Sequence, residues 1–329
     1  MQVKSHQPKA LEDLVSRHLP SVPLGDEAKL KRALPLLAKS EKAVRAVVSA
    51  LRQVPTIHRF YRADARELGA LPDGSVHLVL TSPPYWTLKR YNSSTGQLGA
   101  VEDYEEFLGE LNKVWRHCHR LLIEGGRMIV VVGDVCLSRR GHGRHAVIPL
   151  HASIQEHCRQ IGFDNLAPII WYKIANAVLE TDNGSSFLGK PYEPNAIVKN
   201  DIEYILMQRK PGGYRSPSPA MRALSVISEE NHRAWFQQIW RLPGASTRQH
   251  PAPFPLELAT RLVRMFSFVG DTVLDPFAGT GTTNVAAAVS GRNSIGVEID
   301  RAYLGNAVQR FETECVELFG NATIEVHTD

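Results

Sequence analysis

The chain has 329 residues, of which 43% are hydrophobic and 22% are charged, so it is long and apolar enough for a folded α/β domain with an insertion. No apolar run approaches a membrane span, and the N-terminal stretch MQVKSHQPKA lacks the apolar core of a signal peptide, so we expect a cytoplasmic protein. The 4 cysteines form no CxxC pair, and the net charge of +4 is compatible with a polyanionic partner without indicating one.

The first 57 residues are expected to form a helical extension of the main domain. Between residues 26 and 54, Leu, Ala and Val recur every three or four positions with Lys and Arg between them, which is typical of amphipathic helices. A solvated helical layer that covers the main domain explains this pattern. Direct contact of these helices with nucleic acid is the alternative.

From residue 58 onward, apolar runs typical of buried strands alternate with helical patterns. Strands are expected at 76–81, 125–134, 166–173, 202–210, 271–277 and 293–300, and helices at 104–122, 147–163, 255–267 and 284–290. This alternation predicts a doubly wound, mostly parallel α/β sheet. Two irregular stretches, 174–201 and 211–249, interrupt the alternation. We expect them to be binding loops, with surface decoration as the alternative.

The stretch VLDPFAGTGTT, residues 273–283, is expected to form a strand, a glycine loop and the start of a helix. Open α/β sheets bind ligands at such places, because the helix N-terminus stabilises a small anion and glycines allow close backbone approach. Asn284 replaces the third glycine of the nicotinamide fingerprint, and the lysine of a P-loop is absent. Glu298, at the end of the next strand, can accept hydrogen bonds from both hydroxyls of a ribose. A ribose with a carboxylate and no phosphate suggests S-adenosylmethionine; glycines that serve only tight packing are the alternative.

The stretch TSPPYW, residues 81–86, ends an apolar strand abruptly. Prolines fix φ, remove N–H donors and push the preceding residue into an extended conformation, so Ser82 would project from the end of the strand. The Ser82 hydroxyl and the Pro83 carbonyl could then accept hydrogen bonds from the exocyclic amino group of a base and free its lone pair for methyl transfer. Tyr85 offers a ring on which an extruded base could stack. A rigid turn with aromatic packing is the alternative.

With these two motifs in this order, residues 58–310 resemble the permuted β group of the DNA amino-methyltransferases. The resemblance implies a Rossmann-like methyltransferase fold with a sheet of the seven-stranded type, S-adenosylmethionine as cofactor, and direct transfer to a flipped base in double-stranded DNA. Serine at the first motif position implies the cytosine-N4 type. Adenine N6 is the alternative on the same fold, and a non-catalytic DNA-binding or regulatory module is the alternative of another class. No cysteine follows a proline, so methylation at cytosine C5 is not expected.

The resemblance also implies roles for individual residues. The catalytic residues are Ser82, Pro83, Pro84 and Tyr85. The cofactor-binding residues are Asp64, His250, Phe254, Asp275, Pro276, Phe277, Ala278, Gly279, Gly281, Thr282 and Glu298. Apart from the resemblance, the basic residues Lys89 and Arg90, which follow the catalytic loop, and Arg139 and Arg140, which follow a strand, are expected to contact DNA, and no metal is expected. The alternatives are a helix N-cap at Asp64, a proline-rich helix start at 250–255, and solvated basic side chains.

The sequence pattern and the resemblance together divide the chain into four parts. These are an N-terminal helical extension at 1–57, a catalytic half at 58–173, insertions with the expected target-recognition region at 174–249, and a cofactor-binding half at 250–329. The third part includes a framework strand at 202–210. Because the third part is short, we expect the N-terminal helices or a second protomer to help in reading DNA; a monomer and a homodimer are both compatible with the sequence. A cognate restriction endonuclease acting on the same DNA site is a candidate partner.

Overall fold

The computed structural model describes residues 7–86, 96–137, 139–144, 146–173, 201–244, 254–317 and 321–328. Its strands are β1 (Thr56–Arg62), β2 (Val76–Thr81), β3 (Leu122–Val132), β4 (Val135–Leu137), β5 (Ala146–Ile148), β6 (Asp164–Lys173), β7 (Ile202–Arg209), β8 (Ile239–Leu242), β9 (Thr272–Asp275), β10 (Asn293–Glu298) and β11 (Ala322–His327). Its helices are α1 (Gln7–His18), α2 (Glu27–Lys39), α3 (Glu41–Leu51), α4 (Tyr104–Leu121), α5 (Arg139–His142), α6 (Leu150–Ile161), α8 (Pro219–Leu224), α9 (Glu229–Trp235), α10 (Leu256–Phe266), α11 (Thr282–Val289) and α12 (Arg301–Phe311), with a 3-10 turn η2 (Leu98–Ala100) and a π-helical turn η4 (Glu312–Val316).

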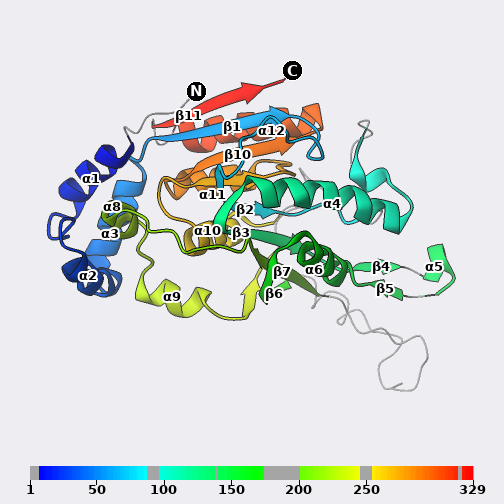
Figure 1. The fold of residues 1–329 in the computed structure, drawn as a ribbon, viewed down its shortest axis with the longest axis horizontal. Coiled ribbons are helices and arrows are strands. Elements are labelled where there is room, and N and C mark those ends of the chain that lie inside the picture. The colour runs from blue at the N-terminus through cyan, green and yellow to red at the C-terminus, as the bar shows by residue number, and fades with distance from the viewer. Residues whose placement is uncertain are drawn as a thin grey trace.

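Nine of the described strands form one sheet in the order β11-β1-β10-β9-β2-β3-β7-β6-β8 (Figure 1). Neighbouring strands pair in parallel except at β7, which runs antiparallel to both β3 and β6. The structure thus confirms the doubly wound, mostly parallel sheet. The edge strands β11 and β8 widen it, and β4 and β5 pair as a separate antiparallel hairpin.

Helices cover both faces of the sheet because alternate residues of the central strands point to opposite sides. On one face, Val79 and Val130 pack with α4 and α6 in an apolar cluster that includes Phe107. On the other face, Leu78 and Leu80 belong to a cluster with α10 and α11. The interior strands read as nearly continuous apolar runs for this reason, and the carboxyl ends of β2, β9 and β10 meet at one edge of the sheet.

The N-terminal helices α1, α2 and α3 pack with α8 around a separate apolar cluster. This cluster includes Val269, which lies just before β9, and the backbone of Gly291, just before β10, faces Leu51 and Val54. The helices therefore cover the amino ends of these strands, at the end of the molecule away from the hairpin β4–β5 (Figure 1). A direct role in reading DNA at the carboxyl ends of the same sheet is not supported by this position.

Two stretches differ from the sequence-based expectation. The expected helix at 147–163 begins only at Leu150, because Ala146–Ile148 pairs with Val135–Leu137 and Pro149 caps the helix. In the stretch expected to be irregular, 211–249, the structure has α8, α9 and β8. Both helices are short and start at serine N-caps, so neither shows the long periodic pattern that reveals a helix. No helix in the described part of the chain is long and apolar enough to cross a bilayer.

Candidate active site

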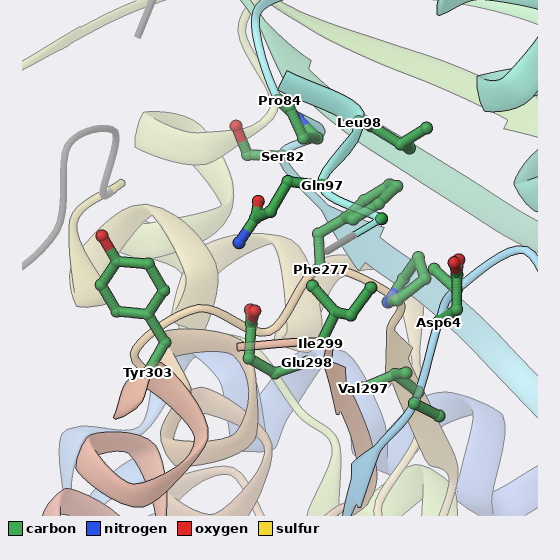
Figure 2. A pocket seen from close by; sticks show the side chains of 14 residues that line it. Asp64, Ser82, Pro84, Gln97, Leu98, Phe277, Val297, Glu298, Ile299 and Tyr303 are labelled. Carbon is green, nitrogen blue, oxygen red and sulfur yellow. The ribbon is translucent and has the colours of Figure 1, made fainter. Parts of the chain in front are cut away.

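A cleft lies at the carboxyl ends of β1, β10, β9 and β2 and contains residues from both sequence motifs (Figure 2). It encloses about 600 Å³, including open solvent at its mouth. Its lining residues are Ala63, Asp64, Ala65, Ser82, Pro84, Gly96, Gln97, Leu98, Pro276, Phe277, Val297, Glu298, Ile299 and Tyr303. The catalytic and glycine-loop motifs, which lie nearly 200 residues apart in the sequence, thus share one cavity.

The glycine loop holds the carboxylate of Glu298 in place. Gly279 adopts a φ of 51°, and its N–H donates to Oε2 of Glu298 at 2.9 Å. The N–H of Asp300 donates to Oε1 at 2.9 Å. Glu298 is 9% exposed, and burial raises its pKa to about 7 despite these two hydrogen bonds. The carboxylate is therefore fixed in orientation and titrates near neutral pH.

The catalytic loop presents Ser82 and Pro84 to the cleft while Pro83 and Tyr85 are buried. The hydroxyl of Ser82 donates to the Tyr85 hydroxyl at 3.3 Å, so its oxygen lone pairs stay available as acceptors. Tyr85 is only 6% exposed, so its ring face is covered in this structure. Trp86 follows with a φ of 45°, unusual for a bulky residue, and its ring packs edge-on against Tyr104 at 5.2 Å between centroids.

A buried hydrogen-bond network joins the two motifs. Asp275 is 2% exposed, and its carboxylate accepts from the Thr81 hydroxyl at 2.6 Å and the Thr283 hydroxyl at 2.7 Å. It also accepts from the N–H of Phe277 at 3.0 Å. Burial raises the pKa of Asp275 to about 6, and these hydrogen bonds oppose that shift. Asp275, expected to bind cofactor, is not among the cleft-lining residues; it fixes the position of the residue that precedes Ser82.

We expect Asp275→Asn to retain the network and Asp275→Ala to break it. An asparagine amide could donate to the Thr283 oxygen while the Thr283 hydroxyl turns to the Leu80 carbonyl, 3.3 Å away. Alanine removes the acceptor of the buried Thr81 hydroxyl and of the partly buried Phe277 N–H, which should lower the free energy of unfolding by about 2 kcal/mol or more. Chemical unfolding would measure the free energy of unfolding of each variant, and calorimetric titration would measure its cofactor affinity. The asparagine variant lacks the charge but is expected to keep the network. A tenfold loss of cofactor affinity in this variant would therefore assign the charge of Asp275 to cofactor binding.

The other expected cofactor residues divide into two groups. Asp64, Pro276 and Phe277 line the cleft with Glu298. Asp64 precedes no helix in this structure, so it is not the N-cap that was its alternative. The second group does not line the cleft. The Ala278 N–H donates to the Val297 carbonyl, and Thr282 accepts from Arg310. A Cβ at Gly281 would lie 3.2 Å from the Ala307 side chain, and Phe254 packs in the core with α10.

Five expected site residues lie wholly or partly outside what the structure describes. His250, Lys89 and Arg90 lie outside the described residues. Arg139 and Arg140 begin α5, between strands β4 and β5, and only their backbone is described. The hairpin that carries them follows the carboxyl end of β3 and projects from the sheet beyond that end (Figure 1).

Several cleft residues were missed by sequence reasoning. Gln97 and Leu98 come from the segment before α4, and Tyr303 comes from the first turn of α12. Figure 2 shows the Gln97 amide between Ser82 and Glu298, with Tyr303 to the left of Glu298 in this view. Ile299, which directly follows the strand-ending Glu298, is the one that position alone could have indicated.

Comparison with known proteins identifies the family. The family model described as DNA methylase, of the N6/N4 type, matches residues 76–309, which include the catalytic loop, the glycine loop and Glu298. The chain belongs to the N6/N4 DNA methylase family. The type II methyltransferase M.MjaI of Methanocaldococcus jannaschii is 37% identical over 280 residues, covering 76% of this chain and 89% of that protein. The DNA adenine methyltransferase YhdJ of Escherichia coli K12 is 27% identical over 260 residues, covering 75% and 79%.

One solved structure is similar to this chain over nearly the whole length of the solved protein. It is a Thermus thermophilus protein described as a DNA modification methylase, in complex with S-adenosyl-L-methionine. It is 52% identical, covers 82% of this chain and 98% of its own, and superposes with a TM-score of 0.68. The methylase described here is therefore a DNA methyltransferase that uses S-adenosylmethionine as cofactor.

The residues of the cleft fit this cofactor. Phe277, Val297 and Ile299 offer apolar walls for a purine ring. The carboxylates of Asp64 and Glu298 are acceptors for amino and hydroxyl groups, and Glu298 already has its orientation fixed by two backbone N–H groups. A buried carboxylate at neutral pH otherwise costs free energy, which hydroxyl donors of a bound ligand would offset.

Proposed function

We propose that this methyltransferase methylates the exocyclic N4 amino group of cytosine in duplex DNA. The observation that carries the proposal is that Ser82, the first residue of the SPPY motif, lies in the same cleft as Glu298. A neutral hydroxyl at this position can accept a hydrogen bond from an aromatic amino group without adding a charge. Resemblance within the family associates serine here with the cytosine-N4 type.

The catalytic loop would activate the amino group by accepting its hydrogens. The Ser82 hydroxyl donates its hydrogen bond to the Tyr85 hydroxyl, and the Pro83 carbonyl meets no competing N–H from Pro84. When both oxygens accept N–H bonds from the base, the nitrogen becomes pyramidal and its lone pair is freed. Bound S-adenosylmethionine supplies an electrophilic methyl group. The acceleration comes from position and preorganised polarity, because the Thr81–Asp275 bond fixes the end of β2 before substrate arrives.

The proposal assigns Tyr85 a role other than the expected stacking on the base. Its ring was expected to stack on the extruded base, but at 6% exposure the ring offers no open face. Its hydroxyl instead lies 3.3 Å from Ser82 Oγ. We therefore assign Tyr85 as a positioning residue that orients the Ser82 hydroxyl.

Adenine N6 is the second candidate, because the relative YhdJ is named a DNA adenine methyltransferase. The two bases present the same kind of amino group, and the pair of acceptors would suit either. The choice then depends on the walls that meet the ring of the base rather than on the acceptors.

The test is to identify the methylated nucleoside. The enzyme is incubated with cofactor labelled in the methyl group and with unmodified bacterial genomic DNA, which is then digested to nucleosides and resolved by mass spectrometry. Labelled N4-methyldeoxycytidine supports the proposal, and labelled N6-methyldeoxyadenosine assigns the second candidate. Labelled 5-methyldeoxycytidine would contradict the direct-transfer chemistry altogether.

The biological setting that we propose is modification of DNA at sites that a restriction endonuclease would otherwise cut. The relative M.MjaI is named a type II methyltransferase. Contacts to DNA phosphates are proposed for Arg139 and Arg140, whose hairpin projects beyond the carboxyl end of the sheet, and for Lys89 and Arg90. Duplex recognition would further use residues within 174–249.

A further inference from the structure

One arginine outside both motifs binds three parts of the chain, and two of these parts line the cleft. The Arg66 guanidinium contacts Asp64, with Nε donating to Oδ1 at 2.9 Å and Nη2 to Oδ2 at 2.5 Å. Nη1 donates to Glu110 Oε2 on α4 at 2.6 Å, and Nη2 also donates to the Gly96 carbonyl at 3.1 Å. Because guanidinium is planar with five donors, a single side chain can serve all three partners.

The segment Gly96–Leu98 forms one wall of the cleft at this point. Gly96 has a φ of 87°, and a Cβ there would lie 3.1 Å from Ile299 Cδ1 and 3.3 Å from Arg66 Nη2. The backbone of this segment is therefore enclosed between Arg66, Asp64 and Ile299. The next residue, Gln97, presents its amide to the cleft (Figure 2).

We propose that Arg66 is a positioning residue that fastens the Gly96–Leu98 segment over the cofactor cleft and so slows release of the cofactor. The guanidinium bonds both the Asp64 carboxylate and the Gly96 carbonyl, so the arginine ties the residues after β1 to the segment before α4. Glu110 anchors the same guanidinium from α4 and is itself paired with Lys113 at 2.6 Å. The proposal rests on the placement of the cofactor in this cleft and holds whichever base is methylated.

The electrostatics agree with a fixed arrangement. Burial alone would raise the pKa of Asp64, but its hydrogen bonds to Arg66 outweigh burial and hold the pKa below its usual value. Asp64 is therefore ionised throughout the neutral range. The side chains of Arg66, Asp64 and Glu110 are 22%, 24% and 21% exposed, so the three charges are partly shielded from competing water and salt.

Two variants disturb the hydrogen bond between Arg66 and the Gly96 carbonyl, one at the donor and one at the acceptor. Arg66→Ala removes the guanidinium, whereas Gly96→Ala keeps both side chains of the Arg66–Asp64 pair and displaces the backbone through its new Cβ and its unfavourable φ. We expect the dissociation rate of S-adenosylmethionine, measured by stopped-flow fluorescence, to rise about tenfold in Arg66→Ala and about fivefold in Gly96→Ala. The value of kcat at saturating cofactor should stay within about threefold of the parent enzyme in Arg66→Ala, because Arg66 does not itself line the cleft.

Hydrogen exchange and two controls make the outcome decisive. Amide exchange at residues 97 and 98 should accelerate in both variants without cofactor. Lys113→Ala, which removes only the exposed partner of Glu110, should leave the dissociation rate unchanged. An unchanged rate of cofactor dissociation in Arg66→Ala would overturn the proposal. So would faster dissociation in Arg66→Ala combined with no effect of Gly96→Ala on amide exchange or dissociation, because the disturbed Asp64 side chain alone would then explain the faster release of cofactor. Intact cofactor binding in Glu298→Ala, run in parallel, would show instead that the cofactor placement itself is wrong.

Discussion

Ser82→Ala is expected to lower kcat for methyl transfer by a factor of about 10² to 10³, the usual effect of removing one preorganised hydrogen-bonding group from a reacting centre. Affinity for S-adenosylmethionine should change by less than about threefold, because Ser82 is proposed to contact the base and not the cofactor. Single-turnover methyl transfer to duplex DNA and calorimetric titration of the cofactor would measure the two quantities separately.

Tyr85→Phe is the matched control for this substitution. It leaves the Ser82 hydroxyl in the cleft and removes the oxygen to which that hydroxyl donates at 3.3 Å. We expect a smaller loss of kcat than in Ser82→Ala, because an unguided hydroxyl still samples the accepting orientation. A Ser82→Ala enzyme that turns over at a rate near that of the parent would show that the acceptor role is wrong.

The second large effect is expected at Glu298. Glu298→Ala should weaken S-adenosylmethionine binding by about 100-fold or more, because it removes the proposed ribose acceptor and the carboxylate that orders the loop through the N–H groups of Gly279 and Asp300. Equilibrium titration without DNA measures this loss. Arg62→Ala, on the surface of a separate groove beside α12, is a control expected to bind normally.

The pKa of Glu298 predicts how cofactor affinity depends on pH. Burial raises this pKa to about 7, so the carboxyl group is ionised above neutral pH and gains a proton as the pH falls through 7. A protonated group accepts less well from hydroxyls, so Kd should be about tenfold higher at pH 6 than at pH 8. Glu298→Gln cannot titrate and should bind weakly with no such dependence. A wild-type Kd that stays constant from pH 6 to 8 would contradict the proposed contact.

Much of the fold and part of the site followed from local sequence. The strand–glycine–helix pattern at 273–283 predicted the loop beside Glu298, and the structure has β9, the turn at Gly279 and α11 there. The elements from β2 to α11 with long periodic patterns were predicted within a few residues. The short elements α8, α9 and β8 were missed, because a few residues stabilised by distant packing carry little periodicity of their own. The strands β1 and β11 and the helix α12 were also not predicted.

By itself, the amino-acid sequence determined the doubly wound architecture, the family and the two motifs, because each depends on residues that are neighbours along the chain. Only the tertiary structure decided which residues face the ligand. Asp275 belongs to the glycine motif yet is buried against two threonines, whereas Gln97 and Tyr303 reach the cleft from elements that no motif marks. The same holds for Arg66, whose three partners are brought together by the folding of β1, α4 and the segment between them. Which side chains face the cleft at the edge of a sheet depends on how segments that are distant in the sequence pack against each other, and local periodicity does not reveal that packing.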